Sequence, residues 1–366
     1  MTLTFQQCET MYANDDMSLL ASDESGYRFL LVKSLIRREY AHALSALLGR
    51  DMSTESVRTW ARSVFDSSAS VEDLKQVISA IYGIERAERF ARESALTTEF
   101  YKMRSFDWGG LYQNSLEKTI VDNYVKKISD FGELNSAIES SLMDSLRGYV
   151  QCSWYNHWTS IVIEDIFKDH AIVTPAVGLI KKIDFFVDDI PFDLKVTYLP
   201  EGYIKDRRRE SNLRPELTLL KQAARKQGAA IQSEIGDGAL LEILWSLCAD
   251  SADADSRDVV KELGRFRKQL KEESRANPTD LIRWFYENQG VRRFDASNRL
   301  FLVLTNGSNF FESWKLKRAS QNLRSQVHAF LDDFDAQRST STLDFTWEGK
   351  TYSATACAIF IDEELH

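Results

Sequence analysis

Residues 181–198 read KKIDFFVDDIPFDLKVTY, and the fold prediction starts from this stretch. Apolar residues alternate with other residues on both sides of an Asp-Asp pair: Ile183, Phe185 and Val187 before it, and Phe192, Leu194, Val196 and Tyr198 after it. Alternation with a period of two is typical of strands that bury one face. Because Asp is favoured in tight turns, Asp188-Asp189 predicts a two-residue loop. The stretch therefore predicts a β-hairpin.

A two-residue loop determines which residues of the two strands face each other. The expected pairs are Val187 with Ile190, Asp184 with Asp193, and Lys182 with Lys195. Directly opposed like charges destabilise a sheet. A protein keeps two opposed carboxylates where a cation lies between them, and a divalent metal ion is the usual candidate. Asp184 and Asp193 are therefore candidate metal ligands, and Lys195 shares a strand face with Asp193.

The length and composition fit a globular protein. With 366 residues, the chain is long enough for two domains that each bury a core. Hydrophobic residues make up 43% and charged residues 28%, and no apolar run reaches the length of a membrane span. The N-terminal residues lack the basic and apolar regions of a signal peptide. The net charge of −9 argues against a uniformly basic surface, although nucleic-acid binding needs only a local positive patch.

The cysteines are far apart and form no Cys-x-x-Cys pair: Cys8, Cys152, Cys248 and Cys357. This spacing argues against structural zinc and against a disulfide framework. We therefore expect a protein of the reducing cytoplasm.

The N-terminal part has the pattern of helices. The first 174 residues contain no proline, and because proline breaks helices, we expect residues 1–150 to form an all-helical domain. That domain would serve recognition, dimerisation or regulation. Apolar spacing predicts helices over Tyr27–Leu48, from Ser70 to about Tyr82, and over Ile84–Phe100. Three arginines lie along one side of the last helix, and we interpret them as a solvated face: Arg86, Arg89 and Arg92.

A further helix is expected over residues 153–169. Its apolar residues cover most of the circumference, which predicts burial. It nevertheless contains Glu164 and Asp165. A buried carboxylate requires a cationic partner or a metal ion, so both acids are of interest.

The pattern changes to alternating strands and helices after residue 170, which predicts an α/β domain over residues 151–366. A strand is expected over residues 171–177, a loop at Pro200–Gly202, and a fully buried central strand over Arg299–Thr305. Residues 240–245 fit a helix or a strand equally well. Residues 343–361 predict a C-terminal hairpin.

Basic residues are concentrated directly after the acidic hairpin. Residues 201–228 hold eight Lys or Arg against four Asp or Glu, a local charge of +4. This placement favours contacts with a phosphate backbone over a merely solvated surface. The candidate nucleic-acid contacts are Lys182, Arg207, Arg208, Arg209, Lys315 and Lys317.

The order of these elements resembles the PD-(D/E)XK nuclease superfamily, the fold of many restriction endonucleases. A helix with Glu164 precedes a strand, then a strand with Asp184, then a strand with Asp193-Leu194-Lys195, then helices and another strand. Eight residues separate Asp184 from Asp193. Ile183 stands where the proline of the motif would be. The resemblance covers about residues 151 to 320.

The resemblance implies a restriction-endonuclease-like mixed sheet flanked by helices, and a Mg²⁺-dependent endonuclease that cuts DNA in restriction or anti-phage defence. Asp184, Asp193, Glu164 and the carbonyl of Leu194 would bind Mg²⁺, and Mn²⁺ would substitute for it. Lys195 would orient or activate the attacking water. A homodimer and a partner protein from a defence system are both compatible with it.

Two other interpretations stay open. The hairpin could be a surface ladder of charges, although surface ion pairs contribute little to stability. The chain could also be an inactive nuclease-fold protein that binds nucleic acid, or a scaffold whose helical half binds a partner. The sequence contains neither a Gly-x-x-x-x-Gly-Lys phosphate loop nor a His-Glu-x-x-His motif, which argues against an ATPase and a zinc protease of those types.

Overall fold

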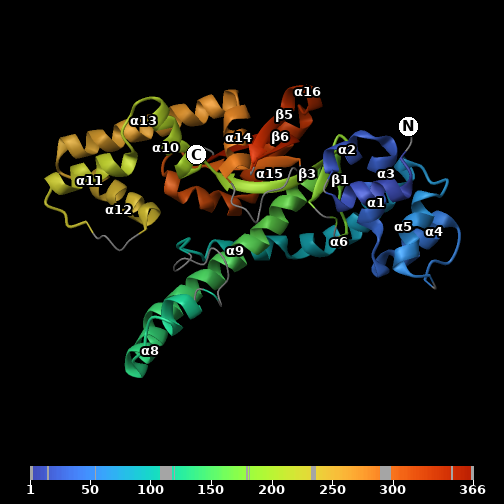
Figure 1. The fold of residues 1–366 in the computed structure, drawn as a ribbon, viewed down its shortest axis with the longest axis horizontal. Helices are drawn as coiled ribbons and strands as arrows, with labels where there is room; N and C mark the ends of the chain where they lie inside the picture. Colours follow the sequence, from blue (N-terminus) through green and yellow to red (C-terminus); the bar gives the residue numbers. More distant parts are fainter. Residues whose placement is uncertain are drawn as a thin grey trace.

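The computed structural model describes residues 3–14, 16–53, 55–107, 118, 120–178, 180, 182–231, 236–288, 298–347 and 349–363. Helices of the N-terminal region lie at one end of the molecule, and a sheet flanked by helices forms the centre (Figure 1). The protein is therefore mixed α/β, with a helical N-terminal part and the sheet in its C-terminal half, as predicted.

Short helices form the N-terminal region: α1 (Phe5–Ala13), α2 (Met17–Ser22), α3 (Glu24–Leu35), η1 (Arg38–Tyr40), α4 (Ala41–Leu48) and α5 (Val57–Phe65). The prediction of one helix over Tyr27–Leu48 is wrong. The chain leaves the helical conformation at Ile36 and Arg37, between α3 and η1. Gly49 ends α4 in the left-handed conformation, with φ of 65°, which only glycine adopts readily.

α6 (Val71–Phe100) is a single helix of 30 residues, so the prediction of two helices separated at Gly83 is wrong. Its N-terminus is the one the sequence predicts. Ser70 accepts the N–H of Asp73, and the Asp73 carboxylate accepts the N–H of Ser70 in return. Gly83 stays helical because one interior glycine costs only about 1 kcal/mol, which its helix-forming neighbours outweigh.

The helical part shares its core with the C-terminal half. Val177, Ile180, Ile183 and Phe186 are buried together with residues of α1 to α6. The expected border at residue 150 is not marked by a break in secondary structure, because α9 (Met143–Lys168) passes through it as one helix. The N-terminal helices therefore pack directly against the predicted hairpin.

Within the described residues, the sheet has six strands in the order β1-β2-β3-β4-β6-β5. Their bounds are β1 (Val173–Pro175), β2 (Phe185–Val187), β3 (Ile190–Tyr198), β4 (Arg299–Thr305), β5 (Ser341–Trp347) and β6 (Lys350–Asp362). β1, β2 and β3 form an antiparallel meander. β4 runs parallel to β3 and to β6, and β5 pairs with β6 as the predicted C-terminal hairpin.

The other helices flank the sheet or extend from it: η2 (Val121–Val125), α8 (Phe131–Ala137), η3 (Ile138–Leu142), α10 (Glu201–Glu210), α11 (Glu216–Lys226), α12 (Asp237–Ala249), α13 (Ala254–Ala276), α14 (Thr279–Asn288), η4 (Phe310–Arg318), α15 (Ser320–Asp332) and α16 (Ala336–Ser339). Residues 240–245 are helical. The loop expected at Pro200–Gly202 is wrong, because α10 begins at Glu201 with Pro200 as its N-cap. None of the described helices combines the length and the apolar character that a membrane crossing needs.

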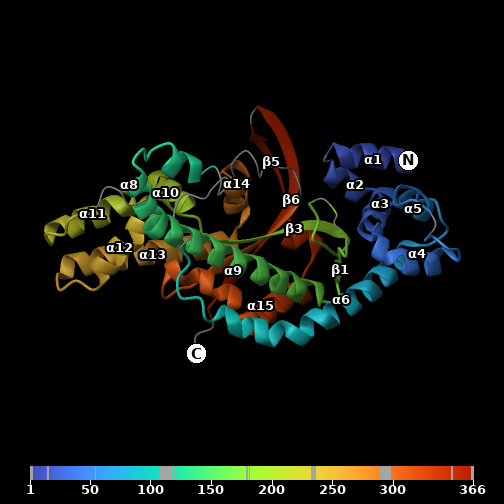
Figure 2. The same cartoon turned by 90° about the horizontal axis from the view of Figure 1, so that it is seen from below.

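The sheet lies between two helical layers. On one face, Leu300, Leu302 and Leu304 of β4 pack with α9 and α15. On the other face, Phe301 and Val303 pack with α10 and α14. Figure 2 shows α6, α9 and α15 together on the first side. Because successive side chains of a strand point to opposite faces, β4 is buried on both, as its continuous apolar sequence predicts.

Candidate functional site

The predicted hairpin is present and has the predicted turn. Val187 pairs with Ile190, and Asp188 and Asp189 lie between them with φ of 47° and 66°. Positive φ at both positions is characteristic of the type I′ turn, in which Asp is tolerated. The first pair of the predicted register is therefore confirmed.

The ladder between β2 and β3 ends sooner than the sequence predicts. Phe185 pairs with Phe192, and the N–H of Asp184 bonds the Phe192 carbonyl at 2.9 Å. Two residues of one strand thus oppose one residue of the other, the arrangement of a β-bulge. The predicted direct opposition of Asp184 and Asp193 is therefore wrong.

The Asp184 carboxylate takes the place of a backbone carbonyl as a hydrogen-bond acceptor in the ladder. Its Oδ2 accepts the N–H of Leu194 at 2.8 Å, so the side chain is held against β3 at the centre of the Asp-x-Lys element. This contact fixes the position of the carboxylate without a direct pair with Asp193. The Leu194 carbonyl as a metal ligand stays a prediction.

Asp193 lies between two cations. Lys195 Nζ donates to Asp193 Oδ1 at 2.5 Å, and Arg299 Nε lies 3.7 Å from Asp193 Oδ2. Asp193 and Arg299 are buried, whereas 39% of the Lys195 side chain is exposed. Lys195 is therefore the partner that solvent or a ligand can reach, and Arg299 is a buried counter-charge.

Burial and negative neighbours act on the Asp184 carboxyl. Its pKa is raised from 3.8 to about 6, first because it is buried and then because of the charges of Glu164 and Asp193. The Leu194 N–H and Lys168 act in the opposite direction. The carboxylates of two separate elements therefore both act on Asp184. A divalent cation beside Asp184 would favour its ionised form.

Glu164 and Asp193 belong to different sides of the sheet. Leu194 and Val196 of β3 pack on the face that α9 covers, and α9 carries Glu164. Asp193 and Lys195 alternate with those apolar residues and so point to the opposite face. Asp184 precedes β2, and the charges of both Glu164 and Asp193 raise its pKa.

The donor set suits a hard divalent cation. Asp184, Asp193 and Glu164 offer carboxylate oxygens, and Mg²⁺ keeps several waters, so one or two protein carboxylates are enough. Glu164 is paired with Lys168 at 3.0 Å. Among the described residues, no three His, Cys, Asp or Glu side chains form a group that could hold a metal ion. Because Mg²⁺ keeps several waters, a cation at Asp184 would need few protein ligands.

Asp165, the second acid of α9, has cationic partners. The Arg89 guanidinium donates to both of its carboxylate oxygens at 2.8 Å. Arg86 is buried, binds Asp169 at 2.8 Å and lies 2.7 Å from Glu93. The interpretation of Arg86 and Arg89 as a solvated face is therefore wrong, because their pairs with Asp165 and Asp169 join α6 to α9 and to the residue that caps it.

Two of the predicted nucleic-acid contacts are buried. Arg208 lies over the Phe266 ring and donates from Nε to the Arg214 carbonyl at 2.8 Å. Lys317 donates to Asn156 Oδ1 at 2.8 Å, and burial lowers its pKa to about 8. Neither side chain can reach a phosphate backbone from this position, so the prediction is corrected for both: they hold neighbouring elements together.

The other predicted contacts are more accessible. Arg209 is exposed and bonds Asp206 at 3.1 Å, and Arg207 and Lys315 are half-buried and also have acidic partners. Lys182 lies in a turn with φ of 62°, which excludes the predicted strand pairing with Lys195. Nucleic-acid binding by these four residues stays a prediction.

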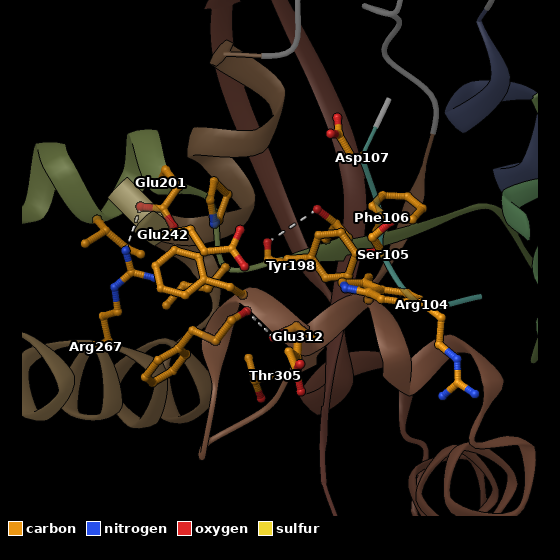
Figure 3. Close-up of a pocket in the computed structure, with 18 residues that line it drawn as sticks. Arg104, Ser105, Phe106, Asp107, Tyr198, Glu201, Glu242, Arg267, Thr305 and Glu312 are labelled. Atoms are coloured by element: carbon orange, nitrogen blue, oxygen red, sulfur yellow. Dashed lines mark hydrogen bonds and ion pairs between the residues drawn. The ribbon is translucent and has the colours of Figure 1, made fainter. Parts of the chain in front are cut away.

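A cavity of about 470 Å³ opens at the carboxyl ends of β3 and β4 (Figure 3). Four carboxylates line it together with aromatic rings: Asp107, Glu201, Glu242 and Glu312. Asp184, Asp193, Lys195 and Glu164 are not among its lining residues. Arg104 and Arg267 also line it, and Arg267 lies 2.7 Å from Glu201, so the lining is of mixed charge and we do not assign the cavity to nucleic acid.

Sequence reasoning missed two charged residues of the site. Lys168 follows Glu164 by one helical turn, a spacing that could have indicated the pair. Arg299 is revealed only by the register of β3 with β4, where it lies beside Asp193. Comparisons with protein-family models, with curated proteins and with solved structures found no match for this chain.

Proposed function

We propose that this protein is a metal-dependent nuclease with a restriction-endonuclease-like core. The observation that carries the proposal is Asp184. Its half-buried carboxyl has a pKa of about 6 beside the charges of Glu164 and Asp193, and it bonds the middle residue of the Asp193-Leu194-Lys195 element. The order of α9, β1, β2, β3, helices and β4, with β4 parallel to β3, supports the proposed core.

Each residue of the site has a proposed role. Asp184 and Asp193 would hold Mg²⁺ or Mn²⁺, with the Leu194 carbonyl as a further oxygen donor, and Glu164 would add negative charge on the α9 side of Asp184. Such an ion, when bound, supplies a water of lowered pKa and stabilises charge on a phosphate oxygen. Lys195 would donate a hydrogen bond to the attacking water or to the phosphate. Arg299 would keep Asp193 neutralised when Lys195 turns away from it.

The proposed substrate is DNA, and the proposed setting is restriction or anti-phage defence in the cytoplasm, which follows from the superfamily resemblance. Exposed and half-buried basic side chains are the proposed backbone contacts: Lys182, Arg207, Arg209 and Lys315. The four cysteines are free and buried, which fits a reducing compartment.

A cleavage assay on several substrates tests the proposal. The full chain is incubated with supercoiled plasmid, linear duplex, single-stranded DNA and RNA, in Mg²⁺, in Mn²⁺ or with EDTA. We expect cleavage of duplex DNA in either metal and none with EDTA. A folded protein that cuts none of these substrates in either metal would contradict it.

One observation favours the inactive alternative. Lys195 is already bonded to Asp193, with Nζ donating to Oδ1 at 2.5 Å. In a nuclease-fold protein that only binds nucleic acid, this ion pair would be permanent. Salt-dependent DNA affinity without cleavage in any metal would support that alternative.

A further inference from the structure

A helical arm projects from the body of the protein (Figure 1). Its outward segment contains η2, and its return segment contains α8, η3 and the first turns of α9. Asp130 caps the return segment by accepting the N–H of Glu133 at 2.8 Å. The arm is therefore a helical hairpin with a defined turn.

This arm has no core of its own. None of residues 120–151, all of which the structure describes, is buried. Large apolar side chains are exposed along it: Val125 by 59%, Phe131 by 75%, Ile138 by 37%, Met143 by 47% and Val150 by 54%. Large exposed apolar patches mark interaction sites, and two helices alone cannot enclose such side chains.

The two segments of the arm carry opposite charge. Residues 118–128 contain Lys118, Lys126 and Lys127 against Asp122, a net charge of +2. Residues 131–151 contain three acids, Glu133, Glu139 and Asp144, against Arg147, a net charge of −2. Each segment therefore complements the other segment of an identical arm.

We propose that two copies of this chain associate through their arms into a four-helix bundle. A two-fold axis places the basic segment of one copy beside the acidic segment of its partner, and the same patch serves on both copies. The bundle core then contains the apolar side chains that one arm leaves exposed. This proposal rests on the arm alone and is independent of the nuclease proposal.

Sedimentation equilibrium of the full chain over a range of concentrations tests the dimer. We expect a dimer at micromolar concentration for the natural sequence. Ile138→Lys and Val150→Lys should each weaken it at least about 30-fold, because each substitution occurs twice in the interface. The matched control is Ile84→Lys on α6, whose side chain is exposed by 71% outside the arm.

A charge exchange tests the pairing of the segments. Lys126→Glu with Lys127→Glu should weaken the dimer, and adding Glu133→Lys with Glu139→Lys should restore it. Circular dichroism confirms that each variant is folded, as expected for substitutions at sites without buried side chains. A natural chain that stays monomeric to about 100 µM would overturn the proposal. So would a dimer that Ile84→Lys weakens and the arm variants do not.

Discussion

Tyr27 Oη donates a hydrogen bond to Asp189 Oδ1 at 2.7 Å and so joins α3 to the tip of the β2–β3 hairpin, 162 residues away in sequence. Lys75 Nζ of α6 donates to the same oxygen at 2.5 Å. The Tyr27 ring also meets Phe186 edge-on, with centroids 5.4 Å apart. The N-terminal helices therefore hold the hairpin that carries the proposed site, which gives the helical part a structural role.

Tyr27→Phe removes the hydroxyl of this contact and keeps the ring. We expect the free energy of unfolding to fall by about 1 kcal/mol, the usual contribution of one hydrogen bond. Urea denaturation measures the difference. Tyr101→Phe, at an exposed tyrosine, is the control and should change stability by less than about 0.5 kcal/mol. Equal effects of the two substitutions would show that the Tyr27–Asp189 bond is not important.

Asp165→Ala leaves Arg89 without its main partner between α6 and α9. We expect a loss of about 1.5–3 kcal/mol, the contribution of hydrogen bonds to a charged group, because Asp165 is buried whereas 33% of the Arg89 side chain is exposed. The control is Asp66→Ala, which breaks the exposed pair with Arg62 and should cost less than about 1 kcal/mol. If both variants unfold at the same denaturant concentration, the α6–α9 ion pairs do not stabilise the fold.

Stability should depend on pH through Asp184. Because its pKa is raised from 3.8 to about 6, the native state binds this proton more tightly than the unfolded state. The stability that the protonated Asp184 carboxyl contributes is therefore fully present below pH 4 and is lost as the pH rises through about 6. Relative to the natural protein, metal-free Asp184→Asn should gain about 1–3 kcal/mol between pH 4 and pH 7.5. A difference that does not change with pH would contradict the raised pKa.

Metal binding should have the opposite pH dependence. A carboxylate must be ionised to bind a metal, so Mg²⁺ or Mn²⁺ should raise the melting temperature at pH 7.5 and have little effect at pH 5. Differential scanning fluorimetry measures both conditions. Asp184→Asn should abolish the effect at pH 7.5. Equal stabilisation of this variant would place the metal elsewhere.

Local rules predicted the hairpin well. The Asp188-Asp189 turn and the pairing of Val187 with Ile190 follow from alternation and turn chemistry, which involve neighbouring residues only. The bulge at Asp184 could not be predicted in this way. It depends on a side chain that takes the place of a backbone acceptor for Leu194, and apolar alternation carries no information about that choice.

Long-range pairs were the other source of error. The arginines of α6 have the spacing of a solvated face, but Arg89 and Asp165 are 76 residues apart and meet only when α6 and α9 pack together. Arg208 likewise lies in a basic run whose pattern cannot separate one buried guanidinium from its exposed neighbours. In both cases, tertiary packing decided the role of the charge.

The rate of Mg²⁺-dependent plasmid cleavage by site variants tests the central claim most directly. The comparison uses the natural protein, Asp193→Asn, Lys195→Met and the control Asp188→Asn, whose carboxyl lies exposed at the turn of the same hairpin. We expect Asp193→Asn and Lys195→Met each to lose at least about 100-fold in rate, and Asp188→Asn to cleave at the natural rate. Cleavage by Asp193→Asn and Lys195→Met at the natural rate would contradict the proposed site.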